Sequence, residues 1–201
     1  MISKSVNFYF SDPRFQMTHA GRLFIRTVFY SVYGLLAAAT ATFLLSDVKW
    51  LFWLGALLLL ILLDRIKHFG QADRSLQKDP MRGEVNLAKY LSPGSFAILE
   101  YAFERAILAE GNFYLFLLKR LVDRKDIKIG LERMDLDSEA VSDKIGELLE
   151  ESLGNKKYLG NRGGHSQQLI LEIEKILKIA LEQAILADGQ FIEPKDLFAS
   201  L

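Results

Sequence analysis

ERAILAEGNF, at Glu104–Phe113, is followed 78 positions later by EQAILADGQF, at Glu182–Phe191. Seven of the ten positions are identical, and the acidic residue before each glycine changes only from Glu110 to Asp188. A phrase of this length recurs rarely by chance in 201 residues. The sequence therefore indicates that one structural unit is present twice.

Each phrase ends a stretch with the apolar spacing of an amphipathic helix. Ser92 and Pro93 supply an N-cap and a first-turn proline for the first helix. We predict that the glycines Gly111 and Gly189 end the two helices in the left-handed conformation. The apolar stripes are Phe96, Leu99, Ala102, Phe103 and Ala106 in the first copy, and Leu169, Ile173, Ile176, Leu177, Ala180 and Ala184 in the second.

The first copy continues beyond its glycine with a short apolar helix at about 114–122 and a charged turn. In the segment 127–153, Asp137 is placed to cap a further helix, with Ile145, Leu148 and Leu149 on its apolar face. A glycine-rich joint at 154–164 separates the copies and lacks the phosphate-binding loop pattern. We expect copy one at about 87–153 and an incomplete copy two at about 166–201.

The front of the chain differs in charge and hydropathy from the back. Residues 1–83 contain ten Lys/Arg and five Asp, whereas residues 84–201 contain fifteen basic and twenty acidic residues. Residues 27–45 carry no charge and would span about 28 Å as a helix, close to the hydrocarbon thickness of a bilayer. A shorter apolar run follows at 48–63. We predict a transmembrane hairpin within a 1–83 segment that ends in a polar linker at 71–84.

The alternative is a buried helical hairpin in a soluble protein. Both runs are apolar on every face, which favours the membrane, because a surface helix shows a polar stripe. Basic residues flank the hairpin on both sides, while the turn has Lys49 beside Asp47. This distribution predicts a multi-pass protein of the inner (cytoplasmic) membrane with the helical domain and both termini in the cytoplasm.

The order of elements in 87–201 resembles the tandem repeat of the Clp N-terminal domain, which heads bacterial AAA+ unfoldases. The stretch LERMDLDSEAVSDKIGELL, Leu131–Leu149, is similar to that family's "leucine, small-apolar, Asp-Pro-Glu-Ala" helix start, with Ser138 in place of proline. The resemblance implies an all-α fold of two pseudo-symmetric helical copies, here preceded by the hairpin. It also implies a chaperone-type role in which protein substrates or adaptors are passed to an AAA+ unfoldase ring, in the same chain or a separate one.

We expect docking residues near the two glycines. Phe113, Tyr114, Phe191 and Ile192 offer apolar contacts, and Glu193, Lys195 and Asp196 rim them. The alternative for the aromatic residues is packing in the core. A Gly-Thr-Glu-His segment that helps some Clp domains bind phosphoarginine is not carried over, because Lys195 stands where an acidic residue would pair with guanidinium.

Composition argues for binding rather than catalysis. There is no cysteine, the three histidines lie far apart, and no nucleophile has a plausible histidine partner. We expect no catalytic residues, no cofactor, no metal and, for an acidic helical domain, no nucleic acid. The partners we expect are proteins and the lipid bilayer. The rival hypothesis is a structural membrane protein whose helical domain mediates oligomerisation or scaffolding.

Overall fold

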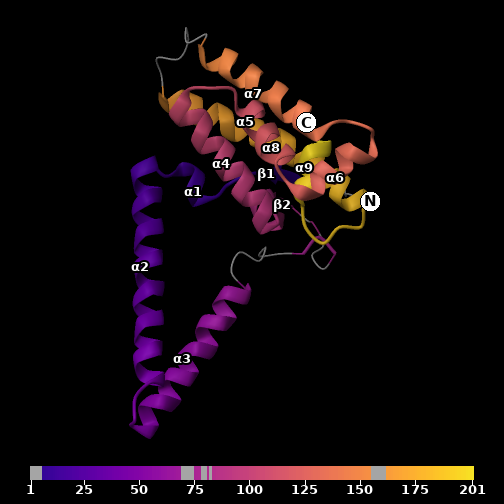
Figure 1. Cartoon of the computed structure of the whole chain (residues 1–201). Coiled ribbons are helices and arrows are strands. Elements are labelled where there is room, and N and C mark those ends of the chain that lie inside the picture. The colour runs from indigo at the N-terminus through magenta and orange to yellow at the C-terminus, as the bar shows by residue number, and fades with distance from the viewer. Residues whose placement is uncertain (1–5, 69–74, 78–80, 82, 155–161) are drawn as a thin grey trace. The chain divides into compact units, whose positions relative to one another are not determined.

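The fold is taken from a computed structural model that describes residues 6–68, 75–77, 81, 83–154 and 162–201 (Figure 1). The predicted linker at 71–84 and joint at 154–164 lie largely outside these residues. The described residues are mostly helical, which confirms the all-α class at that level. Contacts divide it into two units: unit 1 contains 1–15 and 72–201, and unit 2 contains 16–71.

Unit 2 consists of two long helices joined by a short turn. Helix α2 spans His19–Leu44 and α3 spans Lys49–His68, so both predicted apolar runs lie in helices. Thr18 caps α2 by accepting a hydrogen bond from the Gly21 amide at 3.3 Å. The two helices approach closely at Gly55, where an added Cβ would lie 2.8 Å from the backbone nitrogen of Leu44. Glycine is required at this point because the α2 backbone leaves no space for a side chain.

Helix α2 has the length and composition of a membrane span. Within the described part of the chain it is the one helix that meets this criterion, over Ala20–Leu44, and only 6% of its apolar window is buried inside the protein. A core helix of a soluble protein would be mostly buried, whereas a signal sequence near the N-terminus passes the same test. Helix α3 does not meet the criterion over its described residues, so the second crossing and the orientation stay predictions.

The core of unit 1 lies between the two repeated helices, α4 (Pro93–Ala109) and α8 (Arg162–Leu186). The predicted stripes face this core, and all their members are buried except the half-buried Phe96. Ala106 and Ala184, which are equivalent in the repeat, are both completely buried. Their small side chains leave room for α4 and α8 to approach each other.

Helices α5 (Phe113–Val122), α6 (Lys125–Arg133) and α7 (Ser138–Gly154) form a smaller second core. Its buried residues are Val122, Ile127, Leu131 and Ile145. Asp137 caps α7 by accepting a hydrogen bond from the Glu139 amide at 2.9 Å, which confirms the predicted break between α6 and α7. Leu148, expected on the buried face of α7, is 42% exposed.

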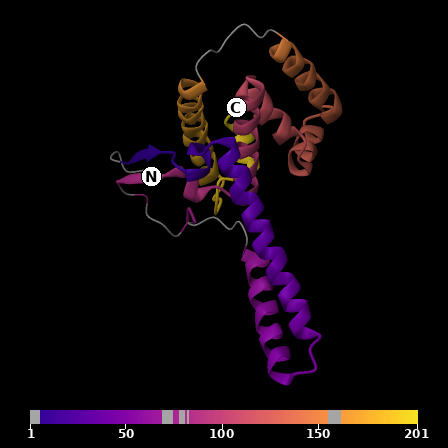
Figure 2. The same ribbon diagram turned by 90° about the vertical axis from the view of Figure 1, so that its left-hand side faces the viewer.

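The N-terminal segment belongs to unit 1, which differs from the predicted boundary at residue 83. Strand β1 (Asn7–Tyr9) pairs in parallel with β2 (Glu84–Asn86) (Figure 2). In this pairing Phe8 lies opposite Val85. The Asn86 side chain extends the pairing, since it donates to the Ser11 carbonyl at 2.7 Å and accepts from the Ser11 amide at 3.1 Å. The short helix α1 (Pro13–Gln16) then delivers Phe15 to the core.

The repeated glycines do not adopt the left-handed conformation that the sequence predicted. At each of these helix ends the residue with positive φ is the one before the glycine, Glu110 or Asp188, each at 52°. At Gly111 an added Cβ would lie 2.8 Å from the Phe116 ring, and at Gly189 it would lie 3.1 Å from a backbone oxygen. Glycine is needed here for close packing after the helix end rather than for its backbone freedom.

Candidate functional site

The segment after α8 is extended and lies against the start of α4. The Gly189 amide donates to the Ala184 carbonyl at 2.8 Å, which closes α8. Ile192 then forms a parallel bridge with Leu91: its amide donates to the Tyr90 carbonyl at 2.9 Å, and the Ser92 amide donates to its carbonyl at 3.0 Å. Ile192 is completely buried, so it holds the two copies together rather than facing solvent.

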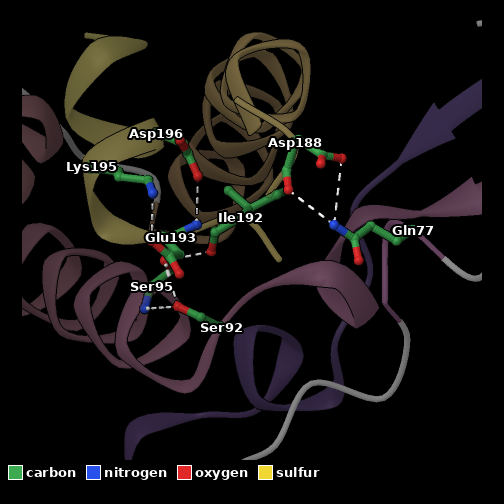
Figure 3. Close-up of polar contacts among 8 residues, drawn as sticks. All are labelled: Gln77, Ser92, Ser95, Asp188, Ile192, Glu193, Lys195 and Asp196. Carbon is green, nitrogen blue, oxygen red and sulfur yellow. Dashed lines mark hydrogen bonds and ion pairs between the residues drawn. The ribbon is translucent and has the colours of Figure 1, made fainter. Parts of the chain in front are cut away.

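Two serines at the start of α4 complete this junction (Figure 3). The buried Ser95 hydroxyl donates to the Ile192 carbonyl at 2.7 Å and lies 3.0 Å from the Ser92 hydroxyl. Ser92 also caps α4 through a hydrogen bond from the Ser95 amide at 3.2 Å, as the sequence predicted. The cap of the first copy's helix and the extended segment of the second copy thus form one hydrogen-bond network.

A segment before β2 contacts the end of α8 from the other side. The Leu76 amide donates to the Gln190 carbonyl at 2.8 Å. The Gln77 side chain donates to the Asp188 carbonyl at 3.0 Å (Figure 3). These contacts occupy backbone groups of the turn that follows α8. The turn is therefore part of the folded framework of unit 1.

The three polar residues of the predicted rim start the short helix α9 (Pro194–Ala199). The Asp196 carboxylate accepts a hydrogen bond from the Glu193 amide at 2.8 Å, which forms half of a capping box (Figure 3). Burial raises the pKa of Asp196 above its ordinary value, while this hydrogen bond and Lys195 act in the opposite direction. The hydrogen bond to Glu193, at 2.9 Å, raises the pKa of Lys195. This ion pair is about half exposed and so contributes little to stability.

The aromatic pair of the first copy begins α5, where the Asn112 side chain caps the helix. Phe113 is 2% exposed and belongs to the core, whereas Tyr114 is 40% exposed. Burial of its hydroxyl, followed by the charge of Glu172, raises the pKa of Tyr114. Tyr114 therefore lies near α8, on a part of the surface that is accessible to a partner.

The predicted docking residues do not form one surface. Ile192 and the start of α9 contact Ser92 and Ser95 at the beginning of α4, whereas Phe113 and Tyr114 follow its end. A helix of 17 residues separates these places by about 25 Å. Phe113, Ile192 and Asp196 are buried, Phe191 is half-buried, and Tyr114, Glu193 and Lys195 are exposed.

An exposed apolar face on α8 was missed by the sequence reasoning. We call it the α8 outer face; it consists of Leu171, Lys175, Ile179, Glu182 and Leu186, all exposed and all within one third of the helix circumference. Leu186 is 81% exposed, Leu171 58% and Ile179 45%. The sequence signal for this face was the spacing of Leu171, Ile179 and Leu186, which lie eight and seven residues apart along α8.

The same outward positions recur in the first copy. At the offset of 78 residues, Ile179 corresponds to Tyr101 and Leu186 to Leu108, and these are 38% and 55% exposed. In the first copy, two arginines cover the aromatic ring: the guanidinium carbons of Arg105 and Arg120 lie 5.5 and 5.2 Å from the Tyr101 ring centre. The position equivalent to Arg105 is Gln183, which carries no charge. The apolar face is thus less covered in the second copy.

Among the residues that the structure describes, no three His, Asp or Glu side chains converge on a point where they could hold a metal ion. No protein-family model, curated protein or solved structure matches the chain. The resemblance to the Clp N-terminal domain therefore stays a prediction.

Proposed function

We propose that this chain is a protein-docking module held at a membrane by its N-terminal helices. The observation that carries the proposal is the repeated leucine of the two phrases, Leu108 and Leu186, which is identical in both copies and yet 55% and 81% exposed. Core packing accounts for the identity of Ala106 and Ala184, but it does not account for an exposed leucine. A large apolar side chain kept on the surface in both copies favours a binding role.

The α8 outer face fits a polypeptide partner. Leu171, Ile179 and Leu186 supply apolar contacts along more than three helical turns, and Lys175 and Glu182 lie between them with opposite charges. An apolar row with interspersed charges of both signs suits an amphipathic helix or an unfolded apolar segment. It does not suit a strongly charged polymer, because the face has no excess of either sign.

Membrane attachment is supported by the exposed apolar surface of unit 2. Helix α2 presents Phe24, Phe29, Tyr30 and Leu35 to its surroundings, each more than half exposed. Side chains of this size on all sides of a helix are stable in hydrocarbon and aggregate in water. The basic residues on both flanks support an orientation with unit 1 on the cytoplasmic face of the inner membrane. On this proposal the chain acts by binding at the membrane and has no catalytic site of its own.

The Clp resemblance suggests which proteins dock. We propose that unit 1 receives substrates or adaptors for an AAA+ unfoldase ring, supplied in the same chain or by a separate one. The rival proposal is that the outer face joins copies of this chain into a scaffold. Both proposals use the same surface, and they differ in the identity of the partner.

A photo-crosslinking amino acid placed at Leu186 tests the proposal in cells that express the full chain. The matched control is Glu139 on α7, which is exposed and is not part of the α8 outer face. We expect adducts from Leu186 and not from Glu139, containing an AAA+ unfoldase subunit or its substrates by mass spectrometry. A single adduct at twice the chain mass of 22.9 kDa would instead support the scaffold. Equal adducts from both positions, or none, would contradict a docking role for this face.

A further inference from the structure

We infer that α3 crosses the bilayer as a second span, so that the turn 46–48 and unit 1 lie on opposite faces of the membrane. This inference rests on the proposed membrane attachment through α2. It commits α3 to one partner, the hydrocarbon of the bilayer. The connectivity of unit 1 supports this inference independently, because the charged residues that flank its apolar run keep α3 from meeting the criterion for a span.

The segments that precede and follow the two helices belong to the same folded unit. Phe8 pairs with Val85 across β1 and β2, and the Asn86 side chain makes two hydrogen bonds to the backbone of Ser11. Phe15, the last residue of unit 1 before the helices, is 2% exposed and packs against Phe103 with ring centres 4.9 Å apart. These contacts form only if residues 6–15 and 83–103 are on the same side of a membrane.

An even number of crossings follows from this connectivity. The chain leaves unit 1 after Phe15 and returns to it at residue 72, so every crossing on the way out requires one on the way back. If α2 crosses once, the second crossing must lie between residues 45 and 72. Helix α3, Lys49–His68, occupies most of that interval. A single span would place β1 and β2 on opposite faces of the bilayer and would abolish their pairing.

The surface of α3 is compatible with hydrocarbon over most of its length. Residues 50–63 carry no charge, and Leu57, Leu60 and Leu63 are 54%, 64% and 53% exposed. This run extends about 21 Å, shorter than a hydrocarbon core of about 30 Å. Lys49 and Asp64 bound it. Local thinning of the bilayer and the long stem of the lysine accommodate the difference.

The two tryptophans support the position of the turn. Trp50 and Trp53 lie in the first turns of α3 and are 66% and 72% exposed. Tryptophan is enriched at the level of lipid headgroups, where its apolar ring and its N–H group both find partners. Their place next to the turn 46–48 therefore assigns that end of the hairpin to a membrane–water interface.

The absence of native cysteine makes the inference testable by labelling single cysteines in the full chain. Val48→Cys reports on the turn, Leu60→Cys on the middle of α3, and Ala140→Cys on an exposed position of unit 1. Intact cells and inverted membrane vesicles are treated with a membrane-impermeant maleimide. We expect Val48→Cys and Ala140→Cys to be labelled from opposite faces, and Leu60→Cys to react only after denaturation in SDS.

Three results would overturn the inference. They are labelling of Val48→Cys and Ala140→Cys from the same face, free labelling of Leu60→Cys in intact membranes, or failure of Val48→Cys to react from either face before denaturation. Carbonate extraction separates these results from failure of the membrane proposal itself. Chain recovered in the supernatant overturns both, whereas chain retained in the pellet with any of the three results overturns the second crossing alone.

Discussion

Removing the Phe15 side chain tests whether the N-terminal segment is part of unit 1. Phe15 is 2% exposed, and its ring centre lies 4.9 Å from that of Phe103, 5.0 Å from Phe10 and 5.6 Å from Phe96. Replacing a buried phenylalanine with alanine costs about 3–5 kcal/mol in the free energy of unfolding, because transfer energy is lost and a cavity remains. That is a large part of the roughly 5–15 kcal/mol that holds a typical domain folded.

The assay must report on unit 1 and not on the membrane helices. Both tryptophans lie in α3, so their fluorescence follows unit 2. Amide hydrogen exchange of α4 and α8 peptides, measured by mass spectrometry on the full chain in mild detergent, follows unit 1 directly. Phe15→Ala should raise the amide exchange rates of both helices. A loss of about 3–5 kcal/mol in stability corresponds to a rate increase of roughly 10²–10³-fold or more.

Tyr9→Ala is the matched control, because Tyr9 belongs to the same segment but is 38% exposed. Its effect on exchange in α4 and α8 should correspond to less than about 1 kcal/mol. If Phe15→Ala left the exchange of α4 unchanged, residues 6–15 would not be part of the core. An even number of membrane crossings would then no longer follow from the connectivity of unit 1.

Three further predictions concern the repeat and its junction. Gly111→Ala should destabilise unit 1 by about 1–3 kcal/mol, because the new Cβ would lie 2.8 Å from the Phe116 ring. The control is Gly130→Ala within α6, where an added Cβ would have no neighbouring atom within 4 Å; this change should stabilise the protein by up to about 1 kcal/mol. Ala184→Leu, at a completely buried position, should cost about 1–3 kcal/mol in chemical unfolding, and an unchanged midpoint would show that the α4–α8 contact tolerates bulk. Burial raises the pKa of Asp196 above its ordinary value, so the stability that the protonated carboxyl contributes is present below the unfolded pKa and is lost as pH rises through the folded pKa. Asp196→Asn should remove this decline from unfolding curves recorded at increasing pH from the ordinary Asp value of about 3.9, and an identical pH profile would contradict it.

Much of the helical layout could be predicted because its signals are local. The Ser92 cap, the Asp137 cap and the apolar stripes are determined by residues within one or two turns of the helix they define. The break between α6 and α7 was found for the same reason. A cap or a stripe needs no knowledge of the rest of the chain, so sequence patterns report it reliably.

The errors concern contacts between segments far apart in the sequence. The pairing of Phe8 with Val85 joins residues 77 positions apart, and its short strand carries no strong periodic signal of its own. The two glycines were correctly predicted to mark the helix ends. The predicted reason for glycine, a left-handed backbone conformation, was wrong. The left-handed residues are acidic, and the space that Gly111 leaves is filled by Phe116 and Leu153. Sequence order alone does not show which side chains meet there.

The candidate site was predicted only in part. The prediction assumed that the residues nearest the two glycines have the same function in both copies. After Gly111 the chain enters α5 at Phe113, whereas after Gly189 it runs extended through Ile192 before α9 begins at Pro194. The extra residues of the second copy are used to bind the start of α4. Their role is therefore to join the copies, and Tyr114 is the aromatic residue of the set that stays accessible.

Comparison of the copies points to where a partner would bind. Buried identities such as Ala106 and Ala184 are accounted for by the packing of α4 on α8, so they carry no functional information. Leu108 and Leu186 are also identical at equivalent positions, but both are exposed, so packing within unit 1 does not explain their identity. The copies differ beside these leucines, because arginines cover Tyr101 in the first, whereas Ile179 in the second is bare. If a partner is shared, we expect crosslinking from Leu186 to exceed that from Leu108, since the face on α8 needs no displacement of a guanidinium group before an apolar side chain can dock.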